Sequence, residues 1–299
     1  MSQATSSSTG RCYGLARVCR VWERARSTVY AGRSRQQRPS RPPARRGPKT
    51  AWTDEALTEQ VRMVLARSSF LGEGHRKVWA RLRLAGTRTS KARVLRLMRE
   101  AGLLAPMRAG VAHGPPAHDG TITTERPNQM WGADATTCLT TREGTATVFV
   151  AVDHCAADCV GIHAARPGTR FEALEPLRQG IREHFGGYGA AVASGLALRH
   201  DHGSQFMSDH FQDELCFLGV ASSPAFVREP EGNGCAERFI RTLKEQLLWV
   251  QTFQTVEELR QALLAFKERY NREWIIQRHG FLTPEQARTR LAAGQRTAA

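Results

Sequence analysis

Three acidic side chains occupy positions where an unpaired carboxylate is unfavourable. Asp134 lies inside an apolar, strand-like segment, Asp201 follows a second such segment, and Glu237 begins a helical segment after a Gly-containing loop. Burying an ionised carboxylate without a partner costs several kcal/mol. Two carboxylates about 4 Å apart repel by roughly 4 kcal/mol at an effective dielectric near 20, and a cation between them reverses the sign. The three residues are therefore candidate metal ligands.

Such a cluster suits the cleavage of a phosphodiester, which is anionic and has a poor leaving group. Two metal ions about 3.5 to 4 Å apart can activate the nucleophile and stabilise the leaving oxygen. Hard carboxylate oxygens favour Mg²⁺ or Mn²⁺, whereas softer donors favour zinc. Taken alone, three acids in a chain of 299 residues are more often ion-pair partners or strand-end residues. The metal interpretation therefore depends on the surrounding sequence.

The elements that would hold these acids follow from the periodicity of the apolar residues. Strands are expected over 130–137, 146–153, 159–164, 196–200 and near 221–226, and helices over 171–185 and 209–218. This order is that of a ribonuclease-H-like fold, although the pattern alone predicts only a mixed α/β domain. A long helix over about 235–250 would place Glu237, Arg241, Lys244 and Leu248 on one face. Further helices are expected over 256–270 and from Thr283, which begins a capping box.

A small helical module precedes this domain. Thr53 can cap a first amphipathic helix, a second helix ends near Gly86, and a third begins after Thr89 or Ser90. Such an arrangement is typical of helix-turn-helix domains. Four basic residues of the third helix lie outside its apolar stripe, where they could contact phosphates or base edges, or simply form a solvated face: Lys91, Arg93, Arg96 and Arg99. A weaker candidate of the same kind spans 15–30, with Val18, Val21 and Trp22 as its apolar face.

The charge of the chain favours a polyanionic partner. The net charge is +15, and the first fifty residues hold twelve Lys or Arg and one acidic residue, Glu23. This basic arm could contact DNA, or it could be a solvated, partly disordered tail, above all over 33–49. No apolar run approaches the roughly 18 residues of a membrane span, and no signal peptide is recognisable. We expect a cytoplasmic protein with no membrane partner.

The seven cysteines are not closely paired and predict no disulfide framework, in keeping with a reducing compartment. His154, Cys155, Cys159 and His163 fall within ten residues and could be drawn as a zinc site. Their spacing matches no familiar ligand set, so small buried thiols are the favoured interpretation.

Three stretches around the acids resemble, in order, the three acidic motifs in the integrase core of bacterial insertion-sequence transposases. They are Trp131-Gly132-Ala133-Asp134-Ala135-Thr136, Arg199-His200-Asp201-His202-Gly203-Ser204-Gln205-Phe206, and the stretch from Asn233 to Lys244. Thirty-five residues separate Asp201 from Glu237, the interval kept in this superfamily. Lys244 stands seven residues after Glu237, where the family places a basic residue against DNA. The resemblance is closest to the second-frame product of the insertion-sequence-three family.

The resemblance extends over roughly residues 55–290. Residues 74–104 resemble the family's helix-turn-helix, and 270–272 and 282–285 resemble its usual ending. The family's Arg-Pro-His after Tyr-Asn is replaced by Glu273-Trp274-Ile275, with Arg278-His279 following, which leaves the role of 273–279 open. The His and Cys zinc module of retroviral integrases is not found. Ser204 and Gln205 could shape the metal-site loop or touch DNA, although short polar residues after a strand usually form the turn.

The resemblance implies a ribonuclease-H-like integrase core with a helix-turn-helix module before it. The expected domains are a basic arm (1–50), the DNA-binding module (51–108), a linker (109–122), the catalytic core (123–290) and a tail (291–299). Asp134, Asp201 and Glu237 would hold Mg²⁺ or Mn²⁺, two ions per active site, for DNA cleavage and strand transfer. The expected partners are double-stranded DNA at element ends and targets and further copies of the chain. A frameshift fusion to an upstream segment and association with the bacterial nucleoid are also implied.

Two other functions remain open at this point. The chain could be a helix-turn-helix protein that occupies terminal repeats without catalysis, although all three acids are intact. It could also be a nuclease that cleaves DNA but does not join it, and this alternative shares the metal site.

Overall fold

The computed structural model describes residues 4–37, 51–106, 124–225 and 230–296. The chain divides into two units, Met1–Ala51 and Trp52–Ala299. The expected linker (109–122) and most of the Pro- and Arg-rich stretch (33–49) lie outside the described residues. Within the described ranges, no helix has both the length and the apolar character needed to cross a membrane.

The first unit contains two helices, α1 (Leu15–Val21) and α2 (Arg26–Gln37). The expected apolar face of this segment is wrong at two positions, because Val21 is 74% and Trp22 is 60% exposed. Cys19 is the buried residue of α1 instead. Helical periodicity predicted the helices here, but it could not show that so short a segment has little to pack against.

The second unit begins with a three-helix module made of α3 (Asp54–Arg67), α4 (His75–Leu84) and α5 (Lys91–Glu100). Both predicted caps are present: Thr53 Oγ1 accepts the N–H of Ala56, and Ser90 Oγ accepts the N–H of Arg93. These bonds satisfy amide groups that a helix start leaves unpaired. One small core holds the module together; its fully buried side chains are Leu57, Val61, Val78, Leu82, Val94, Leu97 and Met98.

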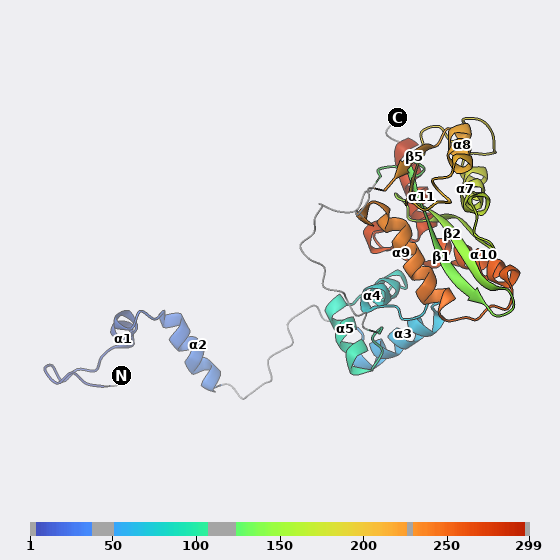
Figure 1. Ribbon diagram of the computed structural model, residues 1–299. Helices are drawn as coiled ribbons and strands as arrows, with labels where there is room; N and C mark the ends of the chain where they lie inside the picture. The colour runs from blue at the N-terminus through green and yellow to red at the C-terminus, as the bar shows by residue number, and fades with distance from the viewer. Residues whose placement is uncertain (1–3, 38–50, 107–123, 226–229, 297–299) are drawn as a thin grey trace. The chain divides into compact units, whose positions relative to one another are not determined.

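A five-stranded mixed sheet forms the centre of the second unit (Figure 1). Its strands are β1 (Met130–Thr140), β2 (Gly144–Asp153), β3 (Cys159–Ala165), β4 (Ala197–His200) and β5 (Ala221–Pro224). The order across the sheet is β3-β2-β1-β4-β5, with β1, β2 and β3 antiparallel and β4 and β5 parallel to β1. This is the ribonuclease-H-like arrangement expected from the order of elements.

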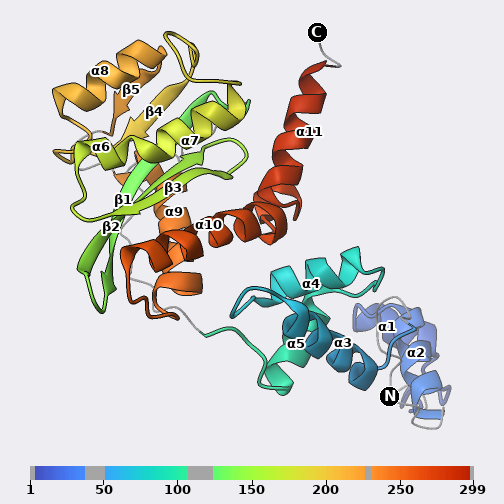
Figure 2. The same cartoon turned by 90° about the vertical axis from the view of Figure 1, so that its right-hand side faces the viewer.

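Helices cover both faces of this sheet (Figure 2). One face carries α6 (Arg170–Ala173), α7 (Glu175–His184) and α8 (Asp209–Leu218), and the other carries α9 (Gly234–Leu243) and α10 (Val256–Glu273). The strands alternate accordingly: in β2, Phe149 packs toward α7 and α8, while Val148 and Val150 pack toward α9 and α10. The single helix expected over 171–185 is in fact two, because Leu174 ends α6 and precedes α7.

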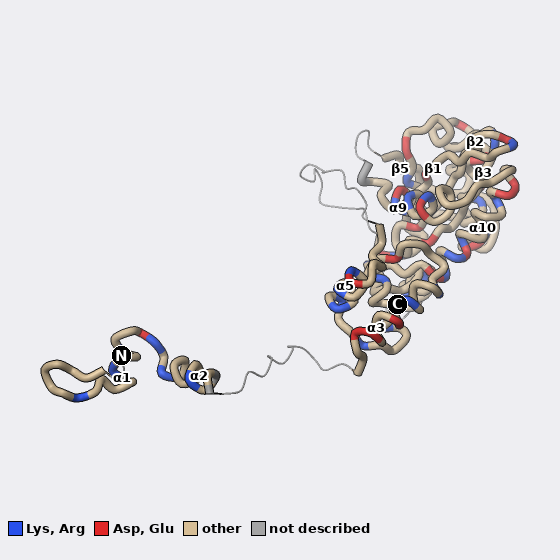
Figure 3. The backbone as a smooth tube through the Cα atoms, turned by 90° about the horizontal axis from the view of Figure 1, so that it is seen from below, with Lys and Arg blue, Asp and Glu red and all other residues tan. Residues whose placement is uncertain are grey.

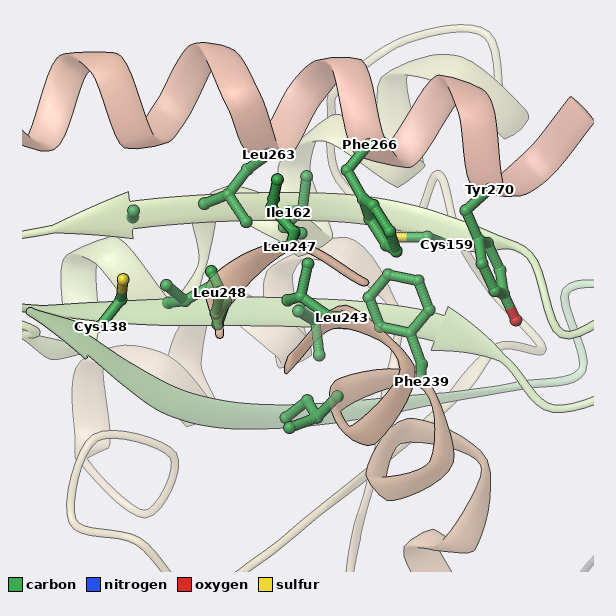
Figure 4. Close-up of a cluster of buried hydrophobic side chains, with 14 of the residues drawn as sticks. Cys138, Cys159, Ile162, Phe239, Leu243, Leu247, Leu248, Leu263, Phe266 and Tyr270 are labelled. Atoms are coloured by element: carbon green, nitrogen blue, oxygen red, sulfur yellow. The ribbon is translucent and has the colours of Figure 1, made fainter. Parts of the chain in front are cut away.

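The helix that carries Glu237 departs from the prediction of one continuous α-helix. After Leu243 it continues as a π-helical turn, η2 (Lys244–Leu248). A π turn holds more residues than an α turn, so it changes the phase of the side chains that follow. Leu248, expected on the face of Glu237, is consequently 91% buried and packs in the core with Leu247. Figure 4 shows both leucines in this core with Phe239, Leu243 and the α10 side chains Leu263, Phe266 and Tyr270.

The C-terminal segment packs against β3 and the turn before it, and its contacts show the structural role of residues 273–279. Asn271 bonds both the N–H and the C=O of Cys159, at 2.9 Å each. Ile275 is buried, and Arg278 donates to the carbonyl oxygens of His154 and Cys155. The predicted capping box is present, with Thr283 and Gln286 bonded reciprocally at the start of α11 (Pro284–Arg296). The remaining elements are the 3₁₀ turns η1 (Pro230–Asn233) and η3 (Gln277–His279).

Candidate active site

Asp134 lies near the middle of β1, on the face of the sheet that α9 covers. Its neighbours in sequence, Trp131 and Ala133, pack on the opposite face, so the alternation of the strand turns Asp134 toward α9. The side chain is partly buried, and its Oδ1 accepts the N–H of Ala135 at 2.8 Å. Burial is the main cause that raises the pKa of Asp134 to about 6, and the negative charges of Asp201 and Glu237 raise it further.

Asp201 follows the last residue of β4, which pairs in parallel with β1. The register places Gly132 opposite Arg199, so its continuation by two residues brings Asp134 beside Asp201. Asp201 is exposed, and its Oδ1 accepts the N–H of Gly203 at 2.8 Å. A Cβ at Gly203 would stand only 2.9 Å from that same oxygen, so the absence of a side chain there permits this tight loop.

Glu237 lies in the first turn of α9, which packs against β1. Its side chain is exposed, yet the surrounding protein partly desolvates the carboxyl and raises its pKa above the usual value. The close approach of α9 depends on Gly132: a Cβ at that position would be 3.3 Å from Ala236 Cβ and 2.5 Å from Asn233 Oδ1. The fold thus brings the three predicted acids near one another beside β1, because the charges of Asp201 and Glu237 both act on Asp134.

The three carboxylates have the chemistry of a site for hard divalent cations. Among the described residues, none of them forms an ion pair, and each of the other two raises the pKa of Asp134. No three acidic, His or Cys side chains of the described part of the chain converge closely enough, as they stand, to hold a metal ion. The fit is therefore one of donor type and charge: three carboxylates with hard oxygen donors, of which the partly buried Asp134 would be stabilised by a divalent cation.

The two basic residues predicted on the helix of Glu237 lie near the carboxylates but differ from each other. Lys244, the first residue of the π turn η2, is partly buried, and its positive charge lowers the pKa of Asp134. Arg241 is exposed and forms an ion pair with Glu245 at 3.1 Å. Lys244 is thus the residue whose charge acts directly at the site.

Three of the four basic residues predicted on α5 make contacts inside the helical module. Arg93 and Arg96 both pair with Asp54, each at 2.6 Å, and together they lower the pKa of that carboxyl. Arg96 also bonds Glu100, and Lys91 lies over the ring of Trp79, 4.6 Å from its centroid. These contacts position the side chains on the surface of α5; whether they touch DNA stays a prediction.

Sequence reasoning did not single out two buried residues beside the acids. Asn233, the last residue of η1, is 95% buried and donates from Nδ2 to the carbonyl of Ala133 at 2.9 Å. Arg199 in β4 is 93% buried and donates to the carbonyl of Pro224. The only signal in the sequence was their place within the acidic motifs. Ser204 and Gln205 lie in the turn between β4 and α8, where the carbonyl of Gln205 accepts a bond from Ser208.

Family models match an HTH-like domain over residues 52–109 and an integrase core domain over residues 218–293. The transposase for insertion sequence element IS629 of Shigella sonnei is 26% identical over 285 residues, which cover 92% of this chain and 91% of that protein. Transposase InsD for insertion element IS2A/D/F/H/I/K of Escherichia coli is 27% identical over 201 residues, 64% of this chain and 66% of that protein.

Solved structures with a similar fold include the catalytic core domain of BIV integrase, with 19% identity and a TM-score of 0.42 over 56% of this chain and 98% of that one. The HTLV-2 integrase catalytic core domain in complex with magnesium has 18% identity and a TM-score of 0.41, over 55% of this chain and 97% of that one.

The two matched domains define an integrase-core protein with a helix-turn-helix-like module in front of the core. Within that class, the chain is similar to insertion-sequence transposases, one of them over 92% of this chain.

Proposed function

We propose that the protein cuts DNA at the ends of an insertion sequence and joins those ends to target DNA, with Asp134, Asp201 and Glu237 as its catalytic carboxylates. The observation that carries this proposal is the proximity of the three acids, because the charges of Asp201 and Glu237 both act on Asp134 and no described side chain forms an ion pair with any of the three. The raised pKa of Asp134 reflects that arrangement. Perturbed carboxyl groups of this kind are common where a protein performs chemistry.

The chain's own residues would prepare the reaction by holding negative charge in a fixed place. Asp134 is fixed by its strand and by the N–H of Ala135, Asp201 by the N–H of Gly203, and Glu237 by the packing of α9 on β1. Two divalent ions, Mg²⁺ or Mn²⁺, held by these oxygens would supply nucleophile activation and stabilisation of the leaving oxygen. Lys244, whose charge already acts on Asp134, would lie where it could contact a DNA phosphate.

In the first step, water would attack a phosphodiester at the element's end and free a 3′ hydroxyl. In the second, that hydroxyl would attack a phosphodiester of the target, so that one P–O bond forms and one breaks, with a target 3′ hydroxyl as the leaving group. No covalent bond to the protein is needed in either step.

The remaining parts of the chain would bind and position DNA. Figure 3 shows Lys and Arg on α2 and α5, in the basic arm and the helix-turn-helix-like module. We propose that Lys91, Arg93 and Arg96 of α5 and Arg241 of α9 contact DNA, with the division into arm (1–50), module (51–108) and core (123–290) as predicted. We also propose that copies of the chain assemble on the element's ends near the nucleoid, with an upstream frameshift-fused segment as a further partner.

The direct test is strand joining by the purified full chain on a labelled duplex that carries the element's own end, with Mg²⁺ or Mn²⁺. We expect joined product from the wild type and none from Glu237→Gln. Glu268→Gln is the matched control, because Glu268 is an exposed carboxylate in an ion pair with Arg272 on α10. Cleavage without joining would instead support a nuclease. Equal DNA binding by all variants without any product would support a DNA-binding protein that lacks catalysis.

A further inference from the structure

The start of α9 lies unusually close to β1, and a single glycine makes this possible. A Cβ added to Gly132 would stand 2.5 Å from Asn233 Oδ1 and 2.8 Å from His154 Nε2. Contacts that short do not occur between real atoms, so any larger residue at 132 would displace one of the two side chains. Gly132 is two residues before Asp134 and on the same face of β1.

Asn233 fills the space that Gly132 leaves. Its Nδ2 donates to the carbonyl oxygen of Ala133 at 2.9 Å, and the residue is 95% buried. The carbonyl it bonds belongs to the residue that directly precedes Asp134, and Asn233 itself lies four residues, about one helical turn, before Glu237. One buried hydrogen bond therefore links the backbone of the first carboxylate to the helix of the third.

On this basis we propose that Asn233, which packs against Gly132, is a positioning residue that sets the separation between Glu237 and Asp134. The inference rests on the proposed function, since that separation matters only if both carboxylates hold the same pair of ions. The amide touches neither carboxylate in the structure and acts through the two backbones. Loss of a group that orients metal ligands typically lowers metal affinity or activity by about 10-fold to 100-fold.

The burial of this amide argues against a purely structural role. Its Oδ1 is buried and, within the described residues, has no hydrogen-bond partner. An unsatisfied buried acceptor costs about 1 to 3 kcal/mol, so an apolar side chain would serve better if the position only had to fill space. What the asparagine provides is the directional bond from Nδ2 to Ala133.

Asn271 is a matched control for this bond. It also fastens a helix of the core to a strand backbone, here α10 to β3, through bonds to the N–H and C=O of Cys159. It lies in the tail motif and not in the acidic motifs. Asn271→Ala should lower the stability of the fold at least as much as Asn233→Ala, without changing the distance between β1 and α9.

The experiment measures Mn²⁺ binding by the full-length protein, read from the loss of the electron paramagnetic resonance signal of free Mn²⁺. Asn233→Ala and Gly132→Ala should each raise the dissociation constant by about 10-fold or more. Gly132→Ala places a Cβ 2.5 Å from Asn233 Oδ1, so it should weaken binding by shifting Asn233 away from Ala133. Asn271→Ala should bind Mn²⁺ like the wild type. Circular dichroism identifies any variant that fails to fold. If Gly132→Ala fails to fold, the Mn²⁺ affinity of Asn233→Ala alone tests the proposal.

Glu237→Gln separates this inference from the proposed function. If Mn²⁺ binding by the wild type does not depend on Glu237, the proposed metal site is wrong. If binding depends on Glu237 but folded Asn233→Ala binds Mn²⁺ as tightly as the wild type, the positioning role alone is overturned. Equal weakening by Asn271→Ala would also overturn it, because general loosening of the fold would then suffice.

Discussion

Two groups of carboxylates lie around the neighbouring strands β1 and β2, one around Asp134 and one around Asp153, and their surroundings differ. Asp153, at the end of β2, is fully buried and accepts the N–H groups of Asn128, Cys155 and Ala156. Arg288 of α11 lies 3.3 Å from Asp153 and pairs with Asp158 through two nitrogens, at 2.7 and 3.1 Å. These two acids have a cation and a full set of donors within the chain.

Asp134, on the neighbouring strand, forms no ion pair among the described residues, although the charge of Lys244 acts on it. It accepts one backbone N–H, and the nearest charges that act most strongly on it are those of two other acids. Burial raises the pKa of Asp158 as well, but there the charge of Arg288 opposes the shift. The first group is completed by the chain and stabilises the fold, and the second is the group that we propose to bind a cation from outside. Such incomplete sites commonly reduce stability in exchange for function.

The largest expected effect is the loss of catalysis at the incomplete group. Asp201→Asn should lower the rate of strand joining by on the order of 10³-fold or more, because it removes a fixed charge at the reacting phosphate. The free energy of unfolding should change by less than about 0.5 kcal/mol, since Asp201 is exposed. Single-turnover joining assays together with urea unfolding would measure both. Near-normal joining would remove Asp201 from the catalytic set.

Much of this comparison could be predicted from sequence, and part of it could not. The strands, the caps of Thr53, Ser90 and Thr283, and the order of the elements along the chain follow from local periodicity and capping residues, which act over a few positions. The proximity of Asp201 to Asp134 depends instead on the parallel pairing of β4 with β1, two segments that are distant in the sequence. At the level of sequence, only the resemblance implied it.

Contacts between distant residues were not predictable in the same way. Arg288 lies 130 residues from Asp158, and no spacing rule indicates that one completes the other. The π turn at Lys244 was also missed, because apolar residues at helical spacing do not show an extra residue in one turn. Asn233 lies inside a recognised motif, but the sequence shows neither its hydrogen bond to Ala133 nor its close approach to Gly132.

A second prediction concerns the completed group. Arg288→Met should lower the free energy of unfolding by about 3 to 5 kcal/mol, because it leaves two buried carboxylates without their cation. Urea unfolding at neutral pH would measure the change. Arg272→Met is the control: Arg272 is 65% exposed and pairs with exposed acids, so less than about 1 kcal/mol is expected. Equal effects would mean that α11 docks without this charge network.

The third prediction has the opposite sign. Because Asp134 has a pKa of about 6 in the fold and an ordinary lower value when unfolded, its ionisation favours the unfolded state. The penalty is absent below about pH 4, grows as the pH rises and is complete above about pH 6. Asp134→Asn should therefore stabilise the protein by about 1 kcal/mol at pH 8, after allowance for solvent screening, and by nothing at pH 4. Stabilisation that does not change with pH would show that charge is not the cause.

The smallest expected effect separates the two groups most directly, because it adds the missing cation. At about five times its dissociation constant, Mn²⁺ should stabilise the wild type by about 1 kcal/mol, since only the folded chain brings the three carboxylates together. Asp134→Asn should show little of this gain despite its higher starting stability. Arg288→Met should keep the full stabilisation by Mn²⁺ despite its lower starting stability, because Arg288 belongs to the group around Asp153. Thermal unfolding of the three proteins with and without Mn²⁺ would give these shifts. If Mn²⁺ instead stabilised Asp134→Asn strongly and Arg288→Met weakly, the ion would bind elsewhere. The two groups of carboxylates would then differ only in burial.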